Sequence, residues 1–177
     1  MNNEELLLRP ARPEELEEVV AFYDIIIDAQ KGQENTPKWT KDVYPAAEHL
    51  KDAVDAGQMH LGFQGDKIVC AEVITGNDEI YERVDWHYDV KDEEVTVIHL
   101  LCVLPEYYRR GFARKMIQYA VDLSRDHGRK VIRLDVIDGN KRAADLYLSE
   151  GFEYIGEYQV YYEDTGLADF WMFERLL

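Results

Sequence analysis

The sequence predicts a single mixed α/β (α+β) domain over residues 1–177, with a central sheet of about seven strands flanked by about four helices. The segment Val95–Val103 is apolar at both alternating sets of positions, which indicates a central strand covered on both faces. A helical stretch follows it and leads into a second apolar strand at residues 131–136. Two further pairs of short alternating segments are typical of β-hairpins.

The expected elements follow the order β-α-α-β-β-β-α-β-α-β-β. A short strand at residues 6–9 precedes a helix at residues 13–29, which begins with the proline that suits a first helical turn. A second helix at residues 46–56 ends before a glycine. The irregular segment 30–45 and the acidic segment 76–94 are expected to be loops, the second with room for a short helix. The remaining expected elements are strands Met59–Gln64, Lys67–Thr75, Glu153–Tyr162 and 168–175, and helices 112–128 and Lys141–Ser149.

The composition favours a globular protein of the cytoplasm that binds neither nucleic acid nor membrane surfaces. Lys and Arg number 20 against 36 Asp and Glu, so the net charge is −16, which repels polyanions and favours a cationic substrate or partner. Acidity that serves solubility alone is the alternative. We expect no signal peptide and no membrane span. Cys70 and Cys102 lie in apolar segments and are expected to be buried free thiols of a reducing compartment.

The turn after the central strand contains the clearest functional signal. Here Leu101-Cys-Val-Leu-Pro105 leads into Tyr108-Arg-Arg-Gly-Phe-Ala113 and then into a helix. The backbone N–H groups of such a turn converge at the positive end of the helix dipole, where a phosphate or diphosphate binds. Four cations also fall within seven residues of an acidic chain, namely Arg109, Arg110, Arg114 and Lys115. A solvated basic surface around a tight turn at Gly111 is the alternative interpretation.

These residues resemble the signature of the GNAT superfamily of acyl-CoA-dependent N-acetyltransferases, Gln/Arg-x-x-Gly-x-Gly/Ala after a strand that ends near Val-x-Pro. Gly111 and Ala113 occupy the small positions, whereas Tyr108 stands where the family has Gln or Arg. A second match follows in Ile132-Arg-Leu-Asp-Val-Ile-Asp-Gly-Asn140, Ala143-Ala144-Asp-Leu-Tyr147 and Gly151-Phe152. The resemblance implies the GNAT fold and transfer of an acetyl group from acetyl-CoA to an amine.

The resemblance also implies roles for individual residues. The central strand would diverge from its neighbour, so that the pantetheine arm pairs with Leu101 and Val103 and a backbone N–H near Val103 faces the thioester carbonyl. Asn140 would contact the cofactor and Tyr147 would protonate the leaving thiolate; they are seven residues apart, so they share one helix face. The expected cofactor-binding residues are Leu101, Cys102, Val103, Arg109, Arg110, Gly111, Phe112, Ala113, Arg114, Asn140, Ala143 and Tyr147.

The amine must lose a proton, and His99 is the leading candidate for its acceptor. Histidine titrates near neutral pH, and this one is expected on the same alternating face of the strand as the residues that would pair with pantetheine. A hydrogen-bonded core histidine is the alternative. For the acceptor amine we expect Trp39 and Tyr44 to hold an alkylammonium by cation–π contact, with Asp28 adding charge. Aromatic residues that merely pack the loop are the alternative.

The sequence therefore predicts an acetyl-CoA-dependent N-acetyltransferase that acts on a small cationic primary amine and holds no metal. One alternative is a peptide or protein N-acetyltransferase. A second is a degenerate module that binds acyl-CoA without turnover, as a sensor or partner, for which Tyr108 is the sequence support. A third is an interaction protein whose acidic face docks a basic partner. The resemblance further suggests a homodimer formed through the C-terminal hairpin.

Overall fold

The computed structural model describes residues 5–177 and contains a seven-stranded sheet in the order β1-β2-β3-β4-β5-β7-β6. The pair β4 and β5 is parallel and every other neighbouring pair is antiparallel. The predicted mixed sheet with four helices is therefore confirmed. The strands are β1 (Leu7–Pro10), β2 (Met59–Gln64), β3 (Lys67–Thr75), β4 (Val95–Val103), β5 (Val131–Ile137), β6 (Glu153–Tyr162) and β7 (Gly166–Leu176), and the helices are α1 (Leu16–Gln30), α2 (Ala47–Asp55), α3 (Phe112–Asp126) and α4 (Lys141–Ser149).

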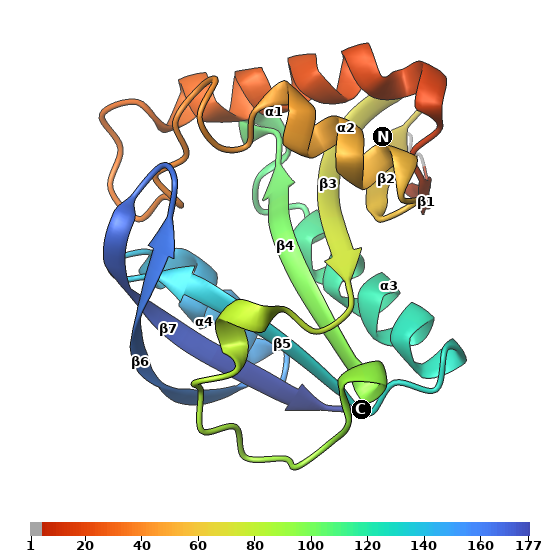
Figure 1. Cartoon of the computed structure of the whole chain (residues 1–177). Helices are drawn as coiled ribbons and strands as arrows, with labels where there is room; N and C mark the ends of the chain where they lie inside the picture. The colour runs from red at the N-terminus through yellow and green to blue at the C-terminus, as the bar shows by residue number, and fades with distance from the viewer. Residues whose placement is uncertain (1–4) are drawn as a thin grey trace.

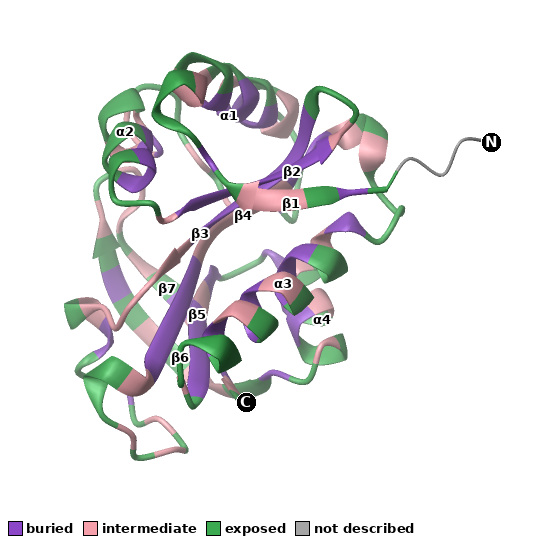
Figure 2. Cartoon of the chain, turned by 90° about the vertical axis from the view of Figure 1, so that its right-hand side faces the viewer, coloured by how far each residue is buried: buried purple, intermediate pink, exposed green. Residues whose placement is uncertain are grey.

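Helices cover both faces of the sheet (Figures 1 and 2). The apolar side of α1, which includes Phe22 and Ile26, packs with α2 against β2 and β3. On the opposite face, Ile117 and Val121 of α3 pack with residues of β5 and α4. Burial of these apolar faces drives the packing of helices on the sheet. Within the described part of the chain, no helix combines the length and apolarity needed to cross a membrane.

Short differences from the expected boundaries occur at the ends of elements. A 3-10 turn, Pro13–Glu15, precedes α1, and the acidic loop 76–94 contains two more, Glu79–Tyr81 and Asp92–Glu94. Both cysteines are free, but Cys102 is only partly buried, in contrast to the expected full burial. The reason is that Cys102 lies beside a cavity, described below.

Strands β4 and β5 diverge after a short paired segment. Their register runs from Val95 opposite Val131 to Val97 opposite Arg133 and then ends. Figure 1 shows β4 rising away from β5 beyond this point. Backbone groups on the β5 side of β4 are therefore left without a strand partner. The divergence that the family resemblance implied is present.

A β-bulge changes which side chains of β4 share a face. Between the pairs Val73–His99 and Ala71–Cys102, β4 contains one residue more than β3, and Leu100 has a left-handed φ of 55°. The buried Tyr23 hydroxyl donates a hydrogen bond of 2.9 Å to the Leu100 carbonyl and so stabilises the bulge.

The expectation that His99 shares a face with Leu101 and Val103 does not hold. Ile98 and Leu101 both pack in the core under α3, and Val103 packs against Phe112 at the start of α3. His99 points to the other face, where its imidazole lies 3.9 Å from the Asp78 carboxylate. The extra residue of the bulge interrupts the period-two alternation between these positions.

Candidate active site

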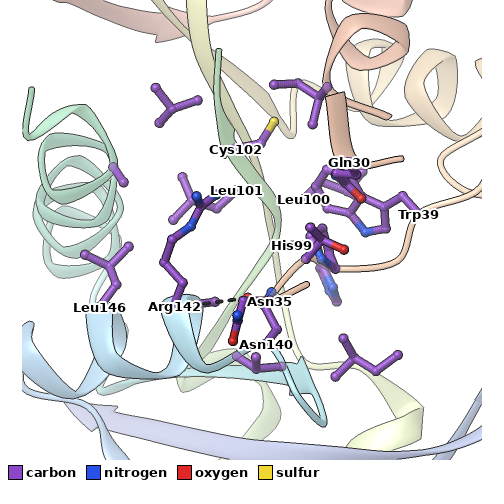
Figure 3. A pocket seen from close by; sticks show the side chains of 18 of the residues that line it. Gln30, Asn35, Trp39, His99, Leu100, Leu101, Cys102, Asn140, Arg142 and Leu146 are labelled. Carbon is purple, nitrogen blue, oxygen red and sulfur yellow. Dashed lines mark hydrogen bonds between the residues drawn. The ribbon is translucent and has the colours of Figure 1, made fainter. Parts of the chain in front are cut away.

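A cavity of about 630 Å³ lies between the diverging strands and reaches both faces of the sheet. Its walls include β4 residues 98–103 and β5 residues 135–137, together with turn residues 107–109 and 111–114. The start of α4 and the loop after α1 complete the lining, and Figure 3 shows the side chains that project into it from these elements. The cavity thus joins residues that are distant in sequence.

The turn before α3 presents free backbone donors to this cavity. Gly111 and Arg109 both adopt left-handed φ values, 79° and 63°, and Gly111 is the N-cap of α3. Within residues 5–177, no loop or side-chain hydrogen bond uses a backbone N–H from Arg109 to Arg114 as its donor. The first N–H groups of a helix have no partner in the helix itself. The turn is therefore free to bind an anion at the positive end of the α3 dipole.

Three arginines line the same part of the cavity and form what we call its basic end: Arg109, Arg114 and Arg142. The Arg114 guanidinium pairs with Glu150 at 2.9 Å. The Arg142 guanidinium lies 4.5 Å from the centre of the Tyr108 ring. Arg142 was missed from the sequence, although it directly precedes Ala143 of the second motif. Arg110, which was expected here, does not line the cavity, because its guanidinium lies over the Tyr107 ring at 4.8 Å.

Helix α4 supplies two further side chains to the cavity. The Asn140 carboxamide oxygen accepts the N–H of Ala143 at 3.4 Å and so caps the helix. Tyr147 lies two turns along the same face and packs on Phe152, with ring centres 5.4 Å apart. Burial raises the pKa of the Tyr147 phenol above its ordinary value, so the hydroxyl stays protonated at neutral pH.

One backbone donor of β4 points into the gap beside β5. The N–H of Leu104 donates to the Val69 carbonyl of β3 at 2.9 Å. Successive N–H groups of an extended chain point to opposite edges, so the N–H of Val103 points away from β3. The side chains of Leu101, Cys102 and Val103 also line the cavity.

His99 lies where the two strands separate. Burial lowers its pKa, while the carboxylates of Asp135 and Asp78 act in the opposite direction. A lowered pKa leaves the imidazole neutral at pH 7 and able to accept a proton. Extending the β4–β5 register by two residues would bring His99 opposite Asp135.

The end of the cavity beyond His99 is acidic and aromatic, and we call it the acidic arm: Asp135, Asp164, Tyr44 and Tyr162. The Tyr162 hydroxyl donates a hydrogen bond of 2.5 Å to Asp135, and the Tyr44 and Tyr162 rings stack with centres 6.2 Å apart. Burial raises the pKa of Asp135, and the hydrogen bond from Tyr162 opposes that effect. Asp135 was missed as a site residue; a lone carboxylate in an apolar strand was the available signal.

The remaining expected acceptor-site residues divide between the cavity and the surface. Trp39 lines the cavity and packs near Tyr23, with ring centres 6.0 Å apart. Asp28 does not line it. The side chain of Asp28 is 56% exposed and pairs with Lys31 at 2.7 Å, because Asp28 lies outside the buried face of α1. Asp28 is therefore not part of this site.

Comparison with known proteins agrees with this geometry. The model of the acetyltransferase (GNAT) family matches residues 33–152. An uncharacterized N-acetyltransferase of Methanocaldococcus jannaschii is 32% identical over 69 residues, which cover 39% of this chain and 30% of that protein. A thialysine N-epsilon-acetyltransferase of Bos taurus is 40% identical over 55 residues, which cover 31% of this chain and 32% of that protein. The chain thus matches about a third of the length of these curated relatives.

Solved structures extend the likeness of the fold to nearly the whole chain. A GNAT-family acetyltransferase of Streptococcus agalactiae superposes with a TM-score of 0.78 over 97% of this chain and 95% of that one. The two sequences are 17% identical, so this likeness concerns the fold alone.

Proposed function

The chain belongs to the GNAT family of acetyltransferases, and we propose that it transfers the acetyl group of acetyl-CoA to a small cationic primary amine. The supporting observation is the continuity of one cavity, which runs from the free amides before α3, through the gap between β4 and β5, to the acidic arm. A diphosphate fits the first part, an extended chain the second and an ammonium the third.

The residues present fit acetyl-CoA, which would supply an acetyl thioester. The amides of residues 109–114, with Arg109, Arg114 and Arg142, would hold the diphosphate. The unpaired edge of β4 would hydrogen-bond the pantetheine arm between Leu101 and Val103. Tyr108 occupies the position where the family has Gln or Arg. The positive charge near this position comes from Arg142, whose guanidinium lies over the Tyr108 ring.

The chain's own groups would act on the reacting atoms as follows. The N–H of Val103 would stabilise negative charge that develops on the carbonyl oxygen. As the N–C bond forms and the C–S bond breaks, His99 would take one proton from the amine nitrogen and Tyr147 would give one to the sulfur. His99 lies on the face opposite α3, so the amine would approach from the acidic arm and the diphosphate from the other side.

An amine panel tests the proposal directly. The purified protein is mixed with acetyl-CoA and single amines, amino acids or short peptides, and the released thiol is followed with a thiol-reactive dye. We expect thiol release that depends on both protein and a cationic amine, with small amines ahead of peptides. Faster thiol release with peptides than with small amines would contradict a small-amine acceptor and indicate a peptide or protein acceptor.

Two other outcomes would contradict the proposed activity. Tight binding of acetyl-CoA by calorimetry without thiol release from any amine would identify a binding module without turnover. Absence of acetyl-CoA binding, together with a stable complex with a basic protein, would identify an interaction protein. The calorimetry and the dye assay therefore separate the three functions.

A further inference from the structure

The cavity is polarised along its length. Its three lining arginines belong to the basic end, whereas the two lining carboxylates, Asp135 and Asp164, belong to the acidic arm. Asp135 comes from β5, and Asp164 comes from the turn between β6 and β7. The fold therefore brings two carboxylates from different elements to the part of the cavity that the cofactor site does not use.

Neither carboxylate has a cationic side chain as its partner. Among residues 5–177, no Lys or Arg forms an ion pair with Asp135 or Asp164. Asp135 has the Tyr162 hydroxyl and the nearby His99, and Asp164 has backbone N–H groups and the nearby His49. Removal of a carboxylate from water is costly unless a positive charge compensates it. A cationic ligand would supply that charge.

One more unused acceptor belongs to the lining of the same cavity. The side-chain oxygen of Gln30 is buried without a hydrogen-bond partner, and Gln30 lines the cavity beside Trp39 and His99 (Figure 3). An ammonium group offers three donors and no acceptor, which matches such a set.

The aromatic rings complete the match. Tyr44 stacks on Tyr162, and burial first, followed by the charges of Asp135 and Asp164, raises the pKa of the Tyr44 phenol. Tyr162 donates to Asp135 at 2.5 Å and lies two residues before Asp164 in the chain, so this pair of rings lies close to both carboxylates. The face of an aromatic ring attracts an ammonium and packs against the methylene groups of an alkyl chain. Two carboxylates near one aromatic surface suit a charged group that is distinct from the reacting amine.

We propose that the acceptor is a diamine, whose second ammonium is held by Asp135 and Asp164 beside the Tyr44 ring while its first amine reacts beside His99. Asp135 is then a specificity-determining residue. The inference rests on the proposed acetyl transfer and narrows its substrate class. A monoamine whose other end carries no charge would leave both carboxylates uncompensated.

The test compares three amines that share a four-carbon chain: 1,4-diaminobutane, 4-amino-1-butanol and butylamine. With saturating acetyl-CoA, we expect kcat/KM for the diamine to exceed that for butylamine by about 10- to 100-fold, which is the usual worth of a charge-assisted hydrogen bond. The amino alcohol should resemble butylamine, because it offers a hydroxyl in place of the charge. Equal values for the three amines would overturn the inference while leaving the acetyl transfer intact.

Variants assign the preference to residues. Asp135→Asn keeps the size of the side chain and its acceptor for Tyr162, and it should reduce the diamine-to-butylamine ratio by about tenfold or more. Asp164→Asn should reduce the same ratio. Calorimetry with acetyl-CoA shows whether each variant is folded, so Asp164→Asn still tests the inference if Asp135→Asn does not fold. Glu163→Gln removes one exposed charge beside Asp164 but outside the cavity lining, and it should retain the ratio.

The outcomes separate the inference from the activity on which it rests. An unchanged ratio in both Asp135→Asn and Asp164→Asn would overturn the diamine assignment. Equal loss of the ratio in Glu163→Gln would also overturn it, because the preference would then reflect net charge and not this pocket. Absence of thiol release with every amine would instead contradict the proposed acetyl transfer itself.

Discussion

Replacement of Tyr147 by Phe tests the proposed proton donor with little structural disturbance. The Tyr147 ring packs against Phe152 and Phe173, with ring centres 5.4 and 6.3 Å away, and phenylalanine keeps both contacts. Among the described residues, no protein group accepts or donates a hydrogen bond at the Tyr147 hydroxyl. Loss of that hydroxyl should therefore change the free energy of unfolding by less than about 1 kcal/mol.

The expected effect on turnover is much larger. A positioned general acid contributes about 10²- to 10⁴-fold to a rate, which corresponds to about 2.7–5.5 kcal/mol of activation free energy. The raised pKa of the buried phenol keeps its proton in place at neutral pH, as this role requires. Tyr147→Phe should thus lower kcat by about two or more orders of magnitude. The affinity for acetyl-CoA should remain within about twofold, since the amides and arginines of the basic end are untouched.

The assay measures kcat by thiol release, acetyl-CoA affinity by calorimetry and stability by urea unfolding. Tyr154→Phe is a matched control, because Tyr154 packs on the same Phe173 at 5.8 Å but is 50% exposed and does not line the cavity. The control should retain wild-type turnover. A Tyr147→Phe protein with wild-type kcat, normal affinity and normal stability would remove Tyr147 from the mechanism.

Three further predictions concern the turn, the sheet and the proton acceptor. Gly111→Val should weaken acetyl-CoA binding, measured by calorimetry, because a valine does not readily adopt the φ of 79° that the turn requires. Gly57→Val is the control: its φ is 67° and its surroundings are equally open, so both variants should lose a similar ~1–2 kcal/mol of stability, but Gly57→Val should keep its affinity. Equal affinity in the two variants would refute the anion turn. Burial raises the pKa of Glu72 well above its ordinary value of 4.5, so the folded state keeps a proton that the unfolded state releases. The stability that comes from this bound proton is fully present below pH 4.5. It falls as the pH rises toward the folded pKa, by about 1.4 kcal/mol per pH unit. Glu72→Gln should flatten that slope in urea unfolding between pH 5 and pH 7, and parallel slopes for the two proteins would exclude the effect. Burial lowers the pKa of His99 below its ordinary value of 6.5, so the kcat of the wild-type protein should fall only below pH 6.5. His99→Ala should abolish this decrease at acid pH. An unchanged pH–rate profile in the variant would show that the proton leaves by another route.

The sequence by itself determined the elements and the anion turn, because both depend on local patterns. The expected bounds of β2, β3, β4, α4 and β6 agree with the structure residue for residue. Apolar periodicity, glycines and caps act over a few residues, which is why they are readable without tertiary contacts. The turn before α3 is likewise one continuous segment, and its left-handed residues Arg109 and Gly111 lie inside the motif.

Only the tertiary structure decided which side chains meet around the acceptor. The bulge at Leu100 depends on the partner strand β3 and reverses the face of His99, which no periodicity of β4 alone indicates. Asp135 meets Tyr162 across 27 residues of sequence, and Arg142 meets Tyr108 across the cavity. Such contacts arise from strand order and strand divergence, so the acidic arm has no sequence signature of its own. Local periodicity specifies elements, whereas the chemistry at their junctions depends on how the whole chain packs.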